Sequence, residues 1–186
     1  LLLTAAGTLG WFLHRAPAEP VRRYAIDLPT NQPMEWGRIG TNIDLSPDVC
    51  TSILVDRHLG GLHHAWAIVA AFGDNLKAVA ATMVRAAGID PATGVTLEQL
   101  GIRLNYNAYG LDLSDLHFHP ADLYRRLQPF ADPLAFHASS PEITVLRNAM
   151  AEDLTRARQL PLQDKGGKTM AVILPDTTWA RRIAGI

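Results

Sequence analysis

From about residue 50 to the C-terminus, apolar residues recur at helical spacing in short segments separated by glycine and proline. The clearest is segment 75–87, in which Leu76 and Met83 share one face and a glycine follows directly as a stop signal. Helices of this kind are stable when each buries its apolar face against a neighbour. The second half of the chain is therefore predicted to fold mainly as packed helices.

Boundary signals predict three more helices. Thr96, with Gln99 three residues later, resembles a capping box and predicts a helix start there. Pro120 fits a first-turn position. The run Ser140–Pro141–Glu142 is expected to open the longest helix, which would end near Gln159.

The remaining segments are shorter. Residues 51–56 are expected to start a helix, a Gly–Gly break follows at 60–61, and residues 63–72 are apolar enough to be buried. Residues 169–174 predict a short apolar strand, and Asp176 or Thr177 would cap a final helix. The predicted fold class is α/β, mostly helical, with the sheet largely absent from this piece.

The first 47 residues are of a different kind. Residues 1–13 are apolar but shorter than the roughly 20 residues that span a bilayer. This run fits a truncated membrane span, the apolar part of a signal peptide or a buried helix. Residues 16–47 are proline-rich, with strand-like alternation only at 24–28, and predict a linker with short strands.

Composition limits the classes of function. With 17 basic and 18 acidic residues the formal charge is -1, which argues against a broad nucleic-acid surface. The single cysteine, Cys50, excludes an internal disulfide framework and a cysteine-based zinc site.

One cluster of candidate metal ligands comprises Asp56, His58, His63 and His64. Its spacing is poor, because Asp56 and His58 would face different sides of a helix and two adjacent histidines cannot both face one metal. The alternative is a solvated helix end followed by a polar turn.

A second candidate is Asp74, which follows the buried segment 63–72. Its carboxylate is placed either as a ligand at the rim of a core or as the N-cap of the next helix. Local sequence alone favours the cap.

Polar and aromatic residues also crowd segment 105–119: Asn105, Tyr106, Asn107, Tyr109, Asp112, Asp115, His117 and His119. They predict either substrate recognition or Asx turns that satisfy their own backbone. On a strand, His117 and His119 would share a face as zinc pairs do, but no third ligand stands at a standard spacing.

Two motifs are excluded. Residues 166–169 read Gly–Gly–Lys–Thr like the end of a phosphate-binding loop, but Leu162 replaces the first glycine and the loop precedes a strand. No nucleophile elbow occurs, and Cys50 has no evident histidine partner.

Three stretches, residues 46–56, 65–75 and 104–118, are similar to bacterial DHH-family phosphoesterases, and residues 174–182 resemble the start of that family's C-terminal substrate-binding domain. The resemblance implies a partial phosphoesterase region at 48–160 and a truncated C-terminal domain at 161–186. It implies a cytoplasmic hydrolase with two divalent ions, usually manganese, that cleaves phosphodiester or phosphoanhydride bonds in nucleotides, oligonucleotides or polyphosphate.

By position in this resemblance, Asp74 corresponds to a metal ligand, and Asn105, Asn107 and Tyr109 are candidates for substrate or supporting contacts. The Asp-His-His motif that names the family has no counterpart, since Asp56-Arg57-His58 follows residues 46–50 when it should precede them. One aspartate cannot build a two-metal site, so this chain alone is expected to be inactive.

Residues 1–48 are weakly similar to the membrane-proximal segment of bacterial proteins with TolB-like β-propellers. This resemblance implies an alternative, a non-enzymatic module tethered to the inner membrane through residues 1–13. Ser46–Pro47–Asp48 occurs in both patterns, so a junction between two spliced reading frames is expected near it. A third possibility is a regulatory module that kept the helices and lost the metals.

Overall fold

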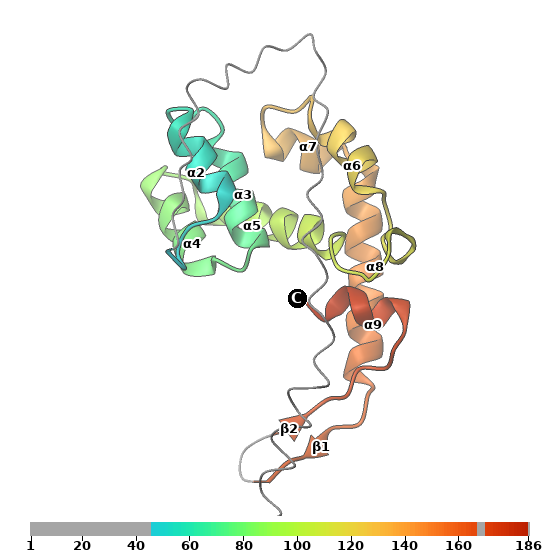
Figure 1. Ribbon diagram of the computed structural model, residues 1–186. Helices are drawn as coiled ribbons and strands as arrows, with labels where there is room; N and C mark the ends of the chain where they lie inside the picture. The colour runs from blue at the N-terminus through green and yellow to red at the C-terminus, as the bar shows by residue number, and fades with distance from the viewer. Residues whose placement is uncertain (1–45, 167–169, 186) are drawn as a thin grey trace, which may run out of the picture. The chain divides into compact units, whose positions relative to one another are not determined.

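Proline opens half of the α-helices in the computed structural model, which describes residues 46–166 and 170–185 (Figure 1). These residues form eight α-helices, one short 3-10 helix and a two-stranded antiparallel sheet, and they belong to one unit, residues 42–186. The expectations for the apolar run 1–13, the strand-like residues 24–28 and most of the linker 16–47 lie outside the described residues.

The α-helices in chain order are α2 (Thr51–His58), α3 (His64–Gly73), α4 (Lys77–Ala86), α5 (Pro91–Tyr106), α6 (Pro120–Leu127), α7 (Pro133–Ser139), α8 (Pro141–Arg158) and α9 (Thr178–Ile183). The 3-10 helix η1 spans Leu113–Asp115. Strands β1 (Gln163–Asp164) and β2 (Met170–Ala171) pair with Gln163 opposite Ala171. The mostly helical expectation is confirmed for the described part of the chain.

Four helices begin with proline at the first position, where the missing amide hydrogen costs nothing: α5, α6, α7 and α8. The prediction that Thr96 opens a helix is wrong, because α5 already begins five residues earlier. The Asp90 carboxylate caps α5 by accepting hydrogen bonds from the amides of Ala92 and Thr93, each 3.0 Å long. Thr96 lies inside the helix, and its hydroxyl donates to the Ala92 carbonyl.

Helix α3 is the centre of the core and packs against α2, α4, α5 and α7 (Figure 1). Its sequence is apolar on every side, as expected of a helix surrounded by others, and Ile68 is fully buried. Helices α3 and α5 approach closely at Gly73 and Gly101. A β-carbon at Gly101 would lie 2.9 Å from the Gly73 amide nitrogen, so only glycine permits this approach.

A second set of contacts joins α7 to this core through aromatic rings. Phe136 of α7 is 1% exposed, and its ring lies 6.0 Å from that of Trp66 on α3 and 5.4 Å from that of Phe130. The Trp66 indole donates a 2.9 Å hydrogen bond to the Phe130 carbonyl. These contacts give α7, which the sequence did not predict, a place against α3 and α5.

The long helix α8 packs against α5, and α9 packs against α8 and η1 (Figure 1). The observed span of α8 agrees with the prediction that the longest helix would run from residue 141 to about 159. The strand expected at 169–174 is only partly correct, because pairing involves just Met170 and Ala171, and Ile173 is 63% exposed beyond them. In the described ranges, no helix combines the length and apolar character needed to cross a membrane.

Candidate functional site

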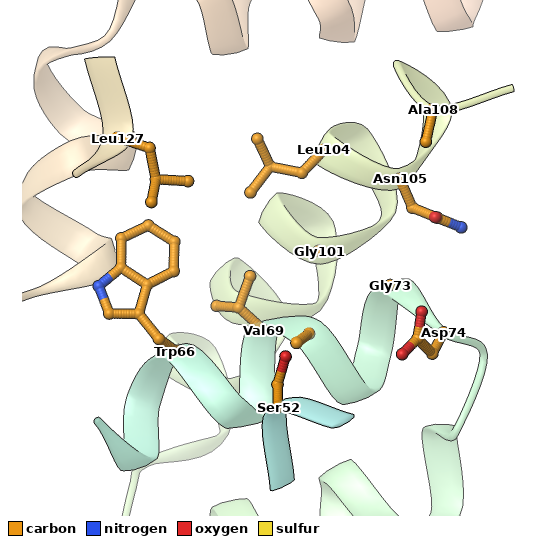
Figure 2. A pocket seen from close by; sticks show the side chains of 11 residues that line it. Ser52, Trp66, Val69, Gly73, Asp74, Gly101, Leu104, Asn105, Ala108 and Leu127 are labelled. Atoms are coloured by element: carbon orange, nitrogen blue, oxygen red, sulfur yellow. The ribbon is translucent and has the colours of Figure 1, made fainter. Parts of the chain in front are cut away.

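An open cleft of about 400 Å³ lies where α2, α3 and α5 meet, and Asp74 lines it (Figure 2). Trp66 and Leu127 stand at one end of the cleft, and Asp74 and Asn105 stand at the other. Ser52 of α2 also lines it. Most of the lining is apolar, and two of its polar side chains, Asp74 and Asn105, lie near the C-terminal end of α3.

Asp74 is the C-cap of α3, so the N-cap function predicted from local sequence is wrong. Helix α4 begins later, with Leu76 at its N-cap and no side-chain capping bond, because Asn75 turns the chain with a positive φ of 61°. The Asp74 side chain is exposed at the cleft. Within residues 46–166 and 170–185, no hydrogen bond or ion pair engages its carboxylate, which is thus available to a ligand.

Asp56 is buried, with 4% of its surface exposed. It is therefore not part of a solvated helix end, which was the alternative to a metal site. Its carboxylate accepts a hydrogen bond from the His63 amide (3.0 Å) and another from the His64 ring Nδ1 (2.9 Å). These bonds hold the turn in which Gly60 and Gly61 adopt φ of 69° and 83°. The acidic residue and one histidine do meet, but as a turn-stabilising pair.

The other proposed histidine ligands are not close to Asp74 in the cleft. His58 is exposed at the end of α2, and His63 is exposed beside a different, smaller pocket that Asp56 also lines. Ser52 and Trp66 line both pockets, whereas Asp74 lines only the larger of these two. None of the three histidines shares the Asp74 cleft.

Of the three candidate substrate-contacting residues, only Asn105 lines the cleft. Its amide nitrogen donates a 3.2 Å hydrogen bond to the Tyr109 hydroxyl. Asn107 is 2% exposed, and its side chain bonds the backbone of His117 and Phe118 ten and eleven residues further on. The Asn107 side chain therefore joins its own helix end to the backbone of residues 117 and 118, and these bonds are not those of a local Asx turn.

The histidine pair at 117 and 119 is not on a strand, so the predicted shared face is wrong. His117 lies in the loop after η1, with its Nε2 2.9 Å from the Tyr106 hydroxyl. His119 is the N-cap of α6, and its Nδ1 accepts a 3.2 Å bond from the Ala121 amide. Each histidine is occupied by a separate structural contact.

A polar network that the sequence did not predict lies between α5, α8 and α9. Asp153 of α8 accepts hydrogen bonds from the Tyr106 hydroxyl (2.6 Å) and from Arg182 Nε (2.9 Å). Burial, followed by the hydrogen bond to Asp153, raises the pKa of Tyr106 above its usual range. Burial, followed by the charge of Arg182, lowers the pKa of His117, which favours the neutral form of its ring.

Arg181 makes the neighbouring contact from α9 to η1. Its guanidinium donates Nε (3.0 Å) and a terminal nitrogen (2.9 Å) to the two carboxylate oxygens of Asp115. This paired geometry gives strong, oriented hydrogen bonds. The hydrogen bond from Arg181, with two backbone amides, lowers the pKa of Asp115 to about 2.

The residues of the cleft supply oxygen ligands of the type that manganese accepts, namely one carboxylate, one amide and one hydroxyl. In the described ranges no group of three or more His, Cys, Asp or Glu side chains could hold a metal ion. These residues do not by themselves complete a two-ion centre, which needs several carboxylates.

Comparisons with family models, curated proteins and solved structures found no match for this chain. The described residues themselves define a mostly helical domain with a small antiparallel hairpin. The similarity to DHH-family phosphoesterases remains a prediction from sequence.

Proposed function

We propose that residues 46–185 are the helical part of an α/β, DHH-type, metal-dependent phosphoesterase, and that Asp74 supplies one ligand to a divalent ion. The observation that supports this proposal is the free Asp74 carboxylate at the cleft between α2, α3 and α5. The buried carboxylates Asp56, Asp115 and Asp153 are all occupied by internal partners.

The proposal assigns different tasks to the two ends of the cleft. At the polar end, Asp74 binds the ion, and Asn105 orients a bound phosphate ester or a metal-bound water. At the apolar end, Trp66 and Leu127 offer a surface for the rest of a nucleotide or oligonucleotide. The bound manganese would supply Lewis-acid stabilisation of charge on the phosphoryl group.

One carboxylate is too few for catalysis, so the proposal requires further ligands from outside the described residues. The isolated chain is expected not to hydrolyse phosphate esters and to bind manganese only weakly. A test must therefore detect weak, local binding. Paramagnetic Mn²⁺ meets this need, since it broadens the NMR signals of nuclei near it even at low occupancy.

The experiment adds substoichiometric Mn²⁺ to the isotope-labelled chain and follows the backbone amide signals. The expected result is selective broadening at Gly73, Asp74 and Asn105, which is lost in Asp74→Asn. The matched control is Glu152→Gln, which removes another exposed carboxylate, on α8, and should leave the broadening unchanged. Equal broadening around Asp74 and Glu152 in the wild type would overturn the metal assignment.

A second candidate is a non-enzymatic helical module. The observation that favours it is that the ionisable groups of the Tyr106–Asp153–Arg182 network serve to hold α9 on the helices. The Mn²⁺ experiment separates the candidates, because such a module has no reason to prefer Asp74. The tether to the inner membrane through residues 1–13, like the cytoplasmic location implied by the first resemblance, remains a prediction.

A further inference from the structure

Helices α4 and α5 both pack against α3 (Figure 1), and an open groove of about 420 Å³ is lined by residues of all three helices. Phe72 of α3 lines this groove and is only 6% exposed, so it forms the base. Helices α4 and α5 supply the two walls. We call the space bounded by Phe72, Ala81, Val84, Gly94 and Val95 the α4–α5 groove.

The groove is open because residues that could fill it are small. Ala81 of α4 ends in one methyl group, and Gly94 of α5 has no side chain. A β-carbon at Gly94 would lie 3.0 Å from a Val84 methyl, so the two helices meet at this point. Val95, on the α5 wall, is 51% exposed. The result is an apolar depression with a volume typical of small-molecule sites.

Two cations line the groove, and neither has an acidic partner in the described ranges. Arg85 of α4 donates a 2.9 Å hydrogen bond to the Thr82 hydroxyl, which leaves most of its five N–H donors free. Lys77, at the start of α4, makes no ion pair with any residue that the structure describes. Other arginines do form ion pairs with carboxylates there: Arg125, Arg126, Arg156, Arg181 and Arg182.

Among the described residues of the lining, the one carboxylate is that of Glu98, and it lies away from Arg85. Only residues 87–90 connect α4 to α5, so Arg85 in the last turn of α4 is at the same end of the groove as Pro91. Glu98 comes seven residues after Pro91, about 10 Å further along α5. The groove therefore has a basic end at Arg85 that is continuous with an apolar base.

We propose that the α4–α5 groove binds a medium-chain fatty carboxylate, with the head group on Arg85 and the alkyl chain over Phe72 and Val95. A guanidinium presents a planar pair of donors that matches a carboxylate. The alkyl chain removes from water the apolar surface that the groove exposes. The span of α4 from Lys77 to Arg85, about 12 Å, limits the length of chain that the groove can cover.

Two observations separate this site from other possibilities. An α-helix of a protein partner is about 10–12 Å across with its side chains, which is a poor fit to a groove of about 420 Å³. No residue of the groove lines the Asp74 cleft, so the inference does not rest on the proposed metal ligand.

Octanoate is the probe, titrated into the full chain at constant ionic strength with sodium chloride as the balancing salt. Valine methyl NMR follows the binding. The expected result is a saturable shift of the Val84 and Val95 signals, while Val145 on α8, which is 46% exposed, does not respond. Octanamide, which has the same chain and no charge, should bind more weakly.

Arg85→Gln tests the head-group contact with little risk to folding, because Arg85 is exposed. It should weaken octanoate binding roughly three- to tenfold, between the effect of an exposed ion pair and that of a charge-assisted hydrogen bond. Arg158→Gln is the matched control, since it removes an exposed arginine from α8 and changes the net charge equally. Asp74→Asn should bind octanoate like the wild type.

Ala81→Leu tests the apolar part, because the larger side chain fills the groove and should abolish the shift at Val95. Ala86→Leu adds the same side chain at an exposed position of α4 outside the groove and should leave binding unchanged. Thermal unfolding of both variants checks that they are folded, and Arg85→Gln decides the matter if Ala81→Leu is not.

Three results would overturn the inference. One is an equal response of Val95 and Val145, which would show non-specific association of the alkyl chain. Another is equal binding of octanoate and octanamide. The third is equal weakening by Arg85→Gln and Arg158→Gln, which would mean that octanoate responds to overall charge and not to the groove.

Discussion

The Tyr106 hydroxyl of α5 donates a 2.6 Å hydrogen bond to the Asp153 carboxylate of α8, and both side chains are almost fully buried. Arg182 of α9 also donates to that carboxylate and supplies the charge that compensates it. A buried carboxylate is tolerated only when it is paired and hydrogen-bonded in this way. Three helices distant in sequence are therefore held at one point.

Removing the Tyr106 hydroxyl should destabilise the fold. His117 Nε2 is 2.9 Å from that oxygen and Arg182 Nε is 3.0 Å from it, so Tyr106→Phe removes an acceptor from both donors and a donor from Asp153. We expect the free energy of unfolding to fall by about 1–3 kcal/mol, the cost of leaving buried polar groups unsatisfied. Urea denaturation measures it.

Tyr124→Phe is the control for this change, because Tyr124 is 62% exposed on α6. It should alter the free energy of unfolding by less than about 0.5 kcal/mol, as surface substitutions usually do. If the two variants lost the same amount, the Tyr106 network would not contribute to stability.

Acid should weaken the attachment of α9 through Asp115. Its folded-state pKa is about 2, below the roughly 3.9 of an unfolded aspartate, so its ionised form stabilises the fold above about pH 4. This contribution is lost as the pH falls from about 4 through 2. The free energy of unfolding should therefore depend less on pH over this window in Asp115→Asn than in the wild type.

The cause of that low pKa can be tested separately. Arg181→Gln should raise the pKa of Asp115 towards its ordinary value, as followed by carboxyl carbon NMR. Arg125→Gln, which breaks the exposed pair with Asp122, should leave the pKa of Asp115 as it is. An unchanged pKa in Arg181→Gln would contradict the assignment of the shift to this arginine.

Local sequence predicted the parts of the fold that depend on neighbouring residues. Pro120 and Pro141 were placed correctly as helix starts, because the signal and its effect lie within one turn. Thr96 and Gln99 misled because a capping-box pattern also occurs inside helices, where Thr96 can bond the carbonyl four residues back. Asp90 followed by Pro91 was the stronger start signal.

The contacts that could not be predicted from the sequence join residues that are far apart in the chain. Tyr106 and Asp153 are 47 residues apart, so no local spacing marks their contact. The position of Asp74 beside the cleft agrees with a residue at the rim of the core, but its C-cap position follows from the positive φ of Asn75. Asparagine adopts a positive φ more readily than most residues, so Asn75 was the sequence signal for a turn directly after Asp74.

The close approach of α3 and α5 should not tolerate a side chain at Gly101. A β-carbon there would meet the Val69 carbonyl oxygen and the Gly73 amide, which are backbone atoms that cannot rotate away. Gly101→Ala should lower the free energy of unfolding by about 1–3 kcal/mol through overpacking, despite the better helix propensity of alanine. Thermal and urea unfolding both report this loss.

Gly94→Ala is the matched comparison within the same helix. Its new methyl would meet a Val84 methyl at 3.0 Å, a side-chain contact that small shifts can relieve. The gain in helix propensity, up to about 1 kcal/mol, should offset much of this strain, so the loss should be smaller than at Gly101. A larger loss at Gly94 would mean that the backbone crossing is not the tightest point of α5.

Asp56 should stabilise the turn between α2 and α3, since its buried carboxylate bonds both the His63 amide and the His64 ring. Asp56→Ala removes both acceptors and should cost about 1–3 kcal/mol of unfolding free energy. It should also speed hydrogen exchange at the His63 amide, which loses its protecting acceptor. Asp48→Ala, at an exposed position before α2, should change neither quantity. Unchanged exchange at His63 in Asp56→Ala would show that the turn is held by its backbone alone.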